Sequence, residues 1–221
     1  MKPLGRISTM WSTELAYAVG LIATDGCLSK DGRHINLTSK DIGQIRTFKK
    51  CLGIKNKVGL KSSGFVKTKK YYNLQFGDIL FYQFLLHTGL TPAKSKTLGE
   101  LKIPDKYFAD FLRGAFDGDG SFFSYWDKRW ASSFMFYLEF ISASPNYIKW
   151  LRARINSLYK LSGHLNKAFN ARVYQLKYAK AEAEIIIKNI YYSPRVPKLS
   201  RKFKKVIRAI DVNNKHNARV L

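Results

Sequence analysis

The 221-residue sequence predicts an α+β protein made of two pseudo-symmetric αββαββα lobes with antiparallel sheets. The chief observation is an internal repeat, because residues 15–26 (LAYAVGLIATDG) are echoed by residues 109–120 (ADFLRGAFDGDG). Residues 72–76 (YNLQF) are likewise echoed by residues 174–178 (YQLKY). The offsets of 94 and 102 residues make each copy about 100 residues long, with the extra length of the second copy expected in a hairpin at 125–131.

The first copy reads as helices alternating with hairpins. Residues 13–24 carry apolar side chains at helical spacing, Ser12 and Thr13 can cap this helix, and Gly26 can end it. Residues 27–38 predict a hairpin that turns at the segment KDGR. The later elements expected in this copy are a helix at 41–52, a hairpin at 55–76 that turns near 62–64, and a helix at 79–87.

The second copy is expected to repeat this order. Its strands fall near residues 121–126, 132–142, 163–168 and 172–178, and a last basic helix is expected at 198–210. Between the copies, a stretch with Pro and Gly at both ends and no clear period indicates a linker. The predicted organisation is an N-terminal lobe at 1–90, a linker at 91–106, and a C-terminal lobe with the basic helix at 107–221.

The composition restricts the class of protein. Apolar residues make up 46% of the chain, so it can bury a core and is not a disordered polycation. The longest apolar run, residues 15–23, is far too short to span a membrane, and the first residues lack a secretory pattern. The only cysteines are Cys27 and Cys51, which predicts reduced thiols and no structural zinc.

The formal charge of +24, from 39 basic and 15 acidic side chains, predicts a polyanionic partner. Residues 1–100 carry +10 and the remaining residues carry +14, so the charge is spread over both copies. A nucleic-acid duplex that lies across two lobes explains this spread better than one binding arm does. A basic surface that is merely solvated is the alternative.

Two acidic helix ends occupy equivalent positions in the repeat. Asp25 and Asp119 each precede a glycine at the end of an expected helix, where the helix dipole disfavours a carboxylate. Each helix also carries small residues one turn apart, which let two backbones approach closely: Ala16 and Gly20, and Gly114 and Gly118. If these faces meet, the carboxylates pair between the lobes and suit a hard cation such as Mg²⁺. A core helix pair with incidental acids is the alternative.

These motifs resemble those of a known family. Residues 20–26 (GLIATDG) and 114–120 (GAFDGDG) look like the two signature helices of a single-chain LAGLIDADG homing endonuclease. Similar to that family, too, are the segments 94–98 (KSKTL), 102–104 (KIP), 191–194 (YYSP) and 199–202 (LSRK). The resemblance implies lobes packed through the two motif helices and antiparallel sheets laid in the DNA major groove. It further implies a monomer, encoded by a mobile intron, that hydrolyses both DNA strands with a divalent metal and leaves short 3′ overhangs.

The resemblance also implies the residues of the metal site. The metal-binding acids fall on Asp25 and Asp119, and the backbone carbonyls of Thr24 and Gly118 would add ligands. Mg²⁺ is the implied cofactor, with Mn²⁺ or Ca²⁺ as other occupants. A metal-activated water needs no protein nucleophile. The four unclustered histidines agree with this, and His216 reads as part of a tail.

The sequence departs from the family motif at Ala23, where the motif has Asp. Asp117 occupies that position in the second copy and could be mistaken for the metal ligand. Asp119 is preferred because it has a counterpart, Asp25, in the first copy.

Lysines that assist catalysis are implied by the resemblance but are harder to place. Lys40 resembles one of them, and Ser39 stands where a residue that positions water often occurs. The matching segment of the second copy (ISASP, residues 141–145) has no lysine, so Lys177 or Lys180 would fill that role. The alternative is that all three lysines are surface residues that contact phosphates.

Strand parity predicts the face that contacts DNA, because alternate side chains point to opposite faces of a sheet. Tyr72, Leu74 and Phe76 are expected to pack under the helices, as are Tyr174, Leu176 and Tyr178. Polar side chains on the other face can read base edges or hold phosphates. The DNA-binding residues predicted are Ser29, Lys30, Arg33, Asn36, Thr38, Lys61, Lys67, Lys69, Tyr71, Asn73, Gln75, Ser133, Tyr137, Glu139, Arg172, Gln175 and Lys177. An ordinary solvated sheet face is the alternative.

Other functions stay open at this point. An intron-splicing maturase, or a regulator of the same fold that binds nucleic acid without cutting it, would use the same architecture. A generic basic RNA-binding protein leaves the repeat unexplained. The expected location is intracellular, in a bacterial or archaeal cytoplasm or in an organelle, and the expected gene is free-standing or intron-encoded.

Overall fold

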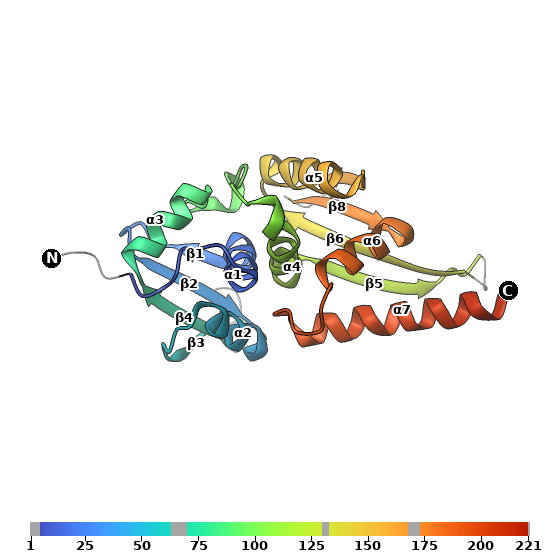
Figure 1. Cartoon of the computed structure of the whole chain (residues 1–221), viewed down its shortest axis with the longest axis horizontal. Coiled ribbons are helices and arrows are strands. Elements are labelled where there is room, and N and C mark those ends of the chain that lie inside the picture. The colour runs from blue at the N-terminus through green and yellow to red at the C-terminus, as the bar shows by residue number, and fades with distance from the viewer. Residues whose placement is uncertain (1–4, 63–69, 130–132, 168–172, 221) are drawn as a thin grey trace.

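The computed structural model describes residues 5–62, 70–129, 133–167 and 173–220, and it contains two lobes side by side (Figure 1). The N-terminal lobe consists of α1 (Thr13–Thr24), β1 (Gly26–Leu28), β2 (His34–Ser39), α2 (Ile42–Leu52), β3 (Val58–Ser62), β4 (Lys70–Gly77) and α3 (Ile79–Thr88). Two short 3₁₀ helices, Lys94–Lys96 and Asp105–Tyr107, follow it. The C-terminal lobe consists of α4 (Phe108–Asp119), β5 (Ser121–Trp126), β6 (Phe134–Ser142), α5 (Pro145–Tyr159), β7 (His164–Lys167), β8 (Tyr174–Ala179) and α6 (Lys180–Ile190), and α7 (Ser200–Val220) ends the chain. The predicted αββαββα order is confirmed in both lobes.

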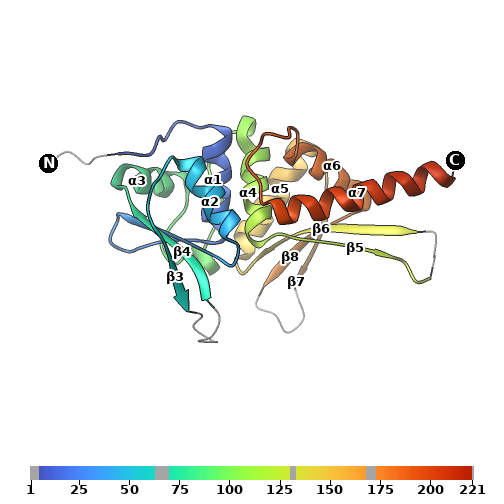
Figure 2. The same cartoon turned by 90° about the horizontal axis from the view of Figure 1, so that it is seen from below.

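Each lobe contains one four-stranded antiparallel sheet. The strand orders are β1-β2-β4-β3 and β5-β6-β8-β7, so the two sheets have the same topology. The register is also equivalent, because Ser39 lies opposite Tyr72 in one sheet and Ser142 lies opposite Tyr174 in the other. The helices gather on one side of the sheets, while the hairpins β3–β4 and β7–β8 extend toward the other side (Figure 2).

Apolar and polar side chains alternate along the strands, and this alternation determines which face of each sheet the helices cover. Leu74 and Phe76 of β4 are buried beneath the helices, as are Leu176 and Tyr178 of β8. Phe76 contacts the rings of the helical residues Phe48 and Phe81, and the intervening strand residues stay at least partly exposed. The predicted strand parity is therefore confirmed, and each sheet keeps one open face.

Helices α1 and α4 lie side by side at the centre of the molecule and join the lobes (Figure 1). Residues 15–23 of α1 are buried on every side, which explains why this helix is apolar all round. A Cβ atom added to Gly20 would lie 2.2 Å from the Phe111 carbonyl oxygen, and one added to Gly114 would lie 2.1 Å from that of Tyr17. Only glycine permits this approach, so the predicted packing through the two motif helices is confirmed.

A buried arginine ties the C-terminal segment to α4. Arg113 is fully buried and donates hydrogen bonds to the carbonyl oxygens of Ile190 and Pro197, both at 2.7 Å. It also forms an ion pair with Asp110 at 2.6 Å and lies over the rings of Tyr17 and Tyr192. Because its hydrogen bonds join α4 to the last residue of α6 and to Pro197, the arginine holds the segment between α6 and α7 in the position from which α7 starts.

The last helix is longer than the sequence analysis predicts. Helix α7 extends to Val220, whereas the expected helix ends at residue 210, and His216 lies within the helix and not in a tail. The polar segment after residue 210 remains helical because α7 packs against β5 and β6, where Asn213 is buried and His216 contacts the edge of Trp126. No helix in the described part of the chain is long and apolar enough to cross a membrane.

The crossing of α1 and α4 leads to a stability prediction. Gly114→Ala should lower the free energy of unfolding by about 2 to 3 kcal/mol, because the added methyl group would displace the backbone of Tyr17. Gly99→Ala is the matched control, since a Cβ atom at that position meets nothing within 4 Å. Urea unfolding followed by circular dichroism measures both variants. Equal stability of the two variants would contradict the proposed close approach.

Candidate functional site

Asp25 and Asp119 end the two central helices and lie close together. Asp25 is the C-cap residue of α1 and Asp119 is the last residue of α4. A Cβ atom on Gly118 would lie only 3.3 Å from the Asp25 carboxylate, so the end of α4 touches Asp25 directly. The structure therefore brings the two acids to one place between the lobes.

The environment of these carboxylates disfavours their charge. Burial and, second, the negative charge of Asp119 raise the pKa of Asp25 to about 6. The pKa of Asp119 is also raised by its partial desolvation, although its side chain is exposed to solvent. Two neighbouring carboxylates that repel each other form a site that a cation would stabilise.

Gln44 supports Asp25 and is a residue that the sequence analysis missed. Its side-chain amide donates hydrogen bonds to the Asp25 carboxylate at 3.0 Å and to the Asp117 carbonyl oxygen at 3.4 Å. Its own carbonyl oxygen accepts a hydrogen bond from Ser39 at 2.5 Å, which fixes the orientation of the amide. Ser39 is buried and contacts Gln44, which lies in the first turn of α2 behind the cap Asp41.

The buried Lys94 and the half-buried Lys202 occupy equivalent places at the two helix ends. Lys94 donates to the carbonyl oxygen of Gly26, and Lys202 donates to that of Gly120, each at 2.6 Å. Gly26 and Gly120 follow the two acids directly, so each central helix end receives one lysine, from the 3₁₀ helix after the N-terminal lobe and from α7. The sequence analysis noted both segments only for their family resemblance. The signal that could have identified them is electrostatic, because an acidic helix end needs a nearby cation.

Burial lowers the pKa of both lysines. The pKa of Lys202 falls to about 8, and that of Lys94 falls below its ordinary value. Lys202 also donates to the carbonyl oxygens of Phe116 and Gly118, at 2.6 and 3.0 Å. Its ammonium group is thus held entirely by the end of α4, within the electrostatic range of both carboxylates.

Within the described part of the chain, the lysines that the sequence analysis proposed as catalytic do not contact the ends of the two central helices. Lys40 is exposed, with its ammonium group 5.5 Å from the centre of the Tyr71 ring on the open sheet. Lys177 lies on the open face of β8, 3.7 Å from Glu139 and 4.1 Å from the centre of the Tyr137 ring.

Lys180 is the first residue of α6 and donates to the Phe134 carbonyl oxygen at 3.0 Å. Phe134 lies opposite Trp126 at the far end of β5. Trp126 is five residues from Ser121, so Phe134 lies about 17 Å from the end of β5 that follows Asp119. The catalytic role expected for Lys180 stays a prediction, although β8 continues directly into α6 and carries this side chain away from the acids.

Asp117 connects α4 to neighbouring segments through hydrogen bonds. It is almost fully buried and accepts hydrogen bonds from the Tyr17 hydroxyl at 2.8 Å and from the Leu199 backbone N–H at 2.7 Å. Burial raises its pKa to about 6. Because it joins α1, α4 and the segment before α7, it has little freedom to act as a metal ligand.

The two backbone ligands implied by the resemblance lie where the helices end. The Gly118 carbonyl oxygen accepts from Lys202, as described above, and keeps one further lone pair. Thr24 directs its hydroxyl back to the carbonyl oxygens of Gly20 and Leu21, both at 3.1 Å. A cavity of about 330 Å³ lies beside them, lined by Ala23, Thr24, Lys94, Ser95, Leu98, Asp119, Ile141, Ser142, Ala143 and Val173.

The donor set fits a hard divalent cation that keeps part of its water shell. Within the described residues, no group of three or more His, Cys, Asp or Glu side chains could hold a metal ion. Mg²⁺ commonly binds one or two carboxylates, with waters and substrate phosphates completing its octahedron. Asp25 and Asp119, with adjacent helix-end carbonyls, offer that kind of incomplete oxygen site.

The open face of the N-terminal sheet carries polar side chains. Asn36 lies opposite Gln75, and Thr38 lies opposite Asn73, to which it donates a hydrogen bond at 3.1 Å. Tyr71 lies opposite Lys61, while Ser29, Lys30 and Arg33 border the β1–β2 turn. Lys67, Lys69 and Arg172 lie outside the described residues.

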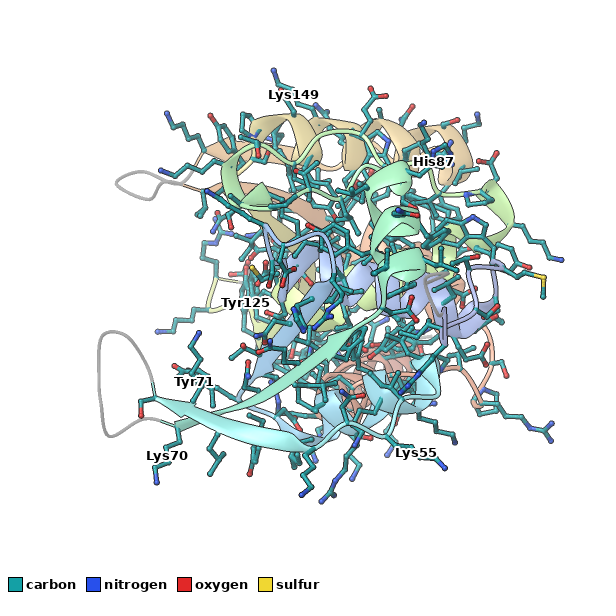
Figure 3. The ribbon with its side chains drawn as sticks, turned by 90° about the vertical axis from the view of Figure 1, so that its left-hand side faces the viewer. Lys55, Lys70, Tyr71, His87, Tyr125 and Lys149 are labelled. Atoms are coloured by element: carbon teal, nitrogen blue, oxygen red, sulfur yellow. The ribbon has the colours of Figure 1, made fainter. Side chains whose placement is uncertain are left out.

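The open face of the C-terminal sheet is different because it carries aromatic rings. Tyr137 stacks between Phe123 and Tyr125, with ring centres 5.2 and 6.2 Å apart. Tyr125 and Tyr71, one from each sheet, lie toward the side of the molecule opposite His87 (Figure 3). Gln175 is partly exposed and lies opposite Ile141, four residues along β6 from Tyr137.

Two of the predicted DNA contacts need correction. Glu139 is only 9% exposed and pairs with Lys177, so it is covered by its neighbour and does not face a partner freely. Ser133 precedes β6 and accepts a backbone hydrogen bond from Asp127 at 2.9 Å, which places it in the hairpin connection and not on the strand.

Comparisons with known proteins identify the fold. No protein-family model and no curated protein matches the sequence. The LAGLIDADG meganuclease I-AabMI bound to uncleaved DNA matches with a TM-score of 0.64 and 15% identity, over 92% of this chain and 91% of that chain. I-DmoI in complex with DNA and Mn matches with a TM-score of 0.52 and 15% identity, over 83% and 98%. The N-terminal LAGLIDADG domain of DUF199/WhiA matches with a TM-score of 0.54 and 15% identity, over 86% and 88%.

These identities are low, so the matches establish the fold alone. They do not decide whether the chain cuts DNA. The chain has the two-lobed LAGLIDADG fold that occurs in single-chain homing endonucleases.

Proposed function

We propose that this protein is a site-specific endonuclease that hydrolyses both strands of duplex DNA with a divalent metal, leaves short 3′ overhangs and serves the homing of a mobile intron. The observation that carries the proposal is the pair of acids, the half-buried Asp25 and the exposed Asp119, at the ends of the two central helices where the lobes meet. This pair of acids lies between the two sheets, and the open faces of the sheets fit the grooves of a DNA duplex. Because both lobes belong to one chain, the enzyme acts as a monomer.

The acids favour an enzyme over a maturase or a regulator that only binds nucleic acid. A binding protein gains nothing from two carboxylates that repel each other and that would also repel phosphates. Placing the carboxylates at helix ends costs free energy, and a cation bound between them and the DNA backbone would offset this cost. The two lysines then offset the remaining negative charge when no cation is bound.

The residues of the site have distinct parts in hydrolysis. A divalent cation, when bound, lowers the pKa of a coordinated water and neutralises charge on the phosphate. Asp25 and Asp119 hold the cation, and Gln44 orients the Asp25 carboxylate through its amide. Lys94 and Lys202 place positive charge at the helix ends, where the negative charge of the transition state develops. No side-chain nucleophile takes part.

The sheets supply affinity and sequence recognition. The N-terminal sheet presents Asn73 and Gln75, whose amides can hydrogen-bond to base edges, whereas the amide oxygen of Asn36 is buried. The C-terminal sheet presents a row of aromatic rings instead, which suits apolar contacts such as thymine methyl groups. Since the two halves differ in chemistry, the DNA target is expected to be asymmetric.

Replacement of either acid tests the catalytic assignment. Asp25→Asn or Asp119→Asn should abolish double-strand cleavage in Mg²⁺, because a neutral amide no longer neutralises the cation, while DNA binding persists. A plasmid library of intron-free host genes identifies the DNA target. Gel electrophoresis then measures cleavage of this target, and a gel-shift assay measures binding to it. Asp31→Asn is a suitable control, since Asp31 lies in the exposed β1–β2 turn and pairs with His34. Loss of binding in parallel with cleavage would count against the metal role.

The raised pKa of Asp25 leads to a pH prediction. The pKa rises from 3.8 to about 6 on folding, so the metal-free protein loses stability as pH rises through about 6, where the proton must leave a buried group. Mg²⁺ competes with that proton. The increase in Tm caused by Mg²⁺ should therefore be small at about pH 5 and larger at about pH 7.5. Differential scanning fluorimetry measures it, and an unchanged Tm increase across this range, or an equal one in Asp25→Asn, would argue against binding at Asp25.

A further inference from the structure

The two halves of the site are not chemically equivalent, although the fold repeats. Ser39 ends β2 and Ser142 ends β6, and two residues later Asp41 and Ser144 cap the following helices. Counting three residues from each cap, the position of Gln44 in α2 corresponds to that of Tyr147 in α5. A tyrosine thus takes the place of the amide that holds Asp25.

Tyr147 has an unusual environment for a core residue. Its side chain is 3% exposed, and it stacks on Trp150 with ring centres 5.7 Å apart. Its hydroxyl group has no hydrogen-bond partner among the described residues. A buried hydroxyl normally has a partner, so one without a protein partner calls for an explanation. The negative charge of Asp119 is close enough, together with burial, to raise the pKa of this phenol.

The surroundings of Asp119 also differ from those of Asp25. The Asp25 carboxylate accepts a hydrogen bond from Gln44, whereas the described residues donate no side-chain hydrogen bond to the Asp119 carboxylate. The cavity of about 330 Å³ opens beside Asp119, and Ala143 lines it at the position equivalent to Lys40. Among the described residues, Asp119 therefore borders the cavity without a side-chain donor of the kind that Gln44 provides to Asp25.

We propose that Tyr147 is the positioning residue of the half of the active site that contains Asp119. Its hydroxyl hydrogen-bonds to the Asp119 carboxylate once DNA and metal are bound. Gln44 holds Asp25 in place before substrate arrives, but Asp119 must be ordered during binding. The strand at Asp119 is consequently cut more slowly, and a nicked duplex accumulates as an intermediate. This inference depends on the proposed nuclease function, and it adds that the two strands are cut in a preferred order.

The test measures the two strands separately. The full-length protein is incubated with Mg²⁺ and a duplex that contains the selected target, labelled at the 5′ end of one strand or of the other. Tyr147→Phe removes only the hydroxyl group and should slow one strand about fivefold, the effect of one ordinary hydrogen bond, while the other strand keeps its rate. Gln44→Leu is the matched variant, and it should slow the opposite strand. The wild-type protein should accumulate nicked duplex, and Tyr147→Phe should increase that accumulation.

Three results would overturn the inference. Equal rates for the two strands in the wild-type protein would remove the preferred order. A Tyr147→Phe variant that slows both strands equally would assign Tyr147 a purely structural role, and one that slows neither strand would exclude any role. If the wild-type protein cuts no DNA at all, the proposed function itself fails, which the same gel distinguishes from these results.

Discussion

The close crossing of α1 and α4 is the contact on which the rest of the structure depends. Glycine in each helix faces backbone of the other, so the helix axes approach more closely than side chains would permit. This approach fixes the distance between the lobes and brings the ends of both helices to one point. Because each sheet begins directly after its central helix, the same contact also sets the position of the two open sheet faces.

Bringing two helix ends together concentrates negative charge. Each end adds its dipole to a carboxylate, and burial strengthens the repulsion between Asp25 and Asp119. The chain places one lysine at each helix end, Lys94 and Lys202, bound to equivalent carbonyl oxygens. Desolvation raises the carboxylate pKa and lowers the lysine pKa, and the attraction between lysines and carboxylates opposes both shifts.

The repeat preserves the backbone but not the chemistry. Gln44 and Tyr147 occupy equivalent positions, as do Lys40 and Ala143, and the open sheet faces are polar in one lobe and aromatic in the other. A single chain can diverge in this way because each lobe has to serve only one half of a duplex. An asymmetric protein then fits an asymmetric target, and it has two half-sites of unequal strength.

The sequence by itself determined the repeat, the two lobes, most of the helices and strands, and the central pair of acids. These features follow from local periodicity, caps and glycine spacing, which act over a few neighbouring residues. Only the tertiary structure decided which side chains support the acids. Gln44, Lys94 and Lys202 reach the site from segments distant in sequence, and no local pattern distinguishes them from surface residues. The burial of Glu139 under Lys177 and the length of α7 likewise depend on which strand or helix lies alongside, so packing between elements was needed to settle them.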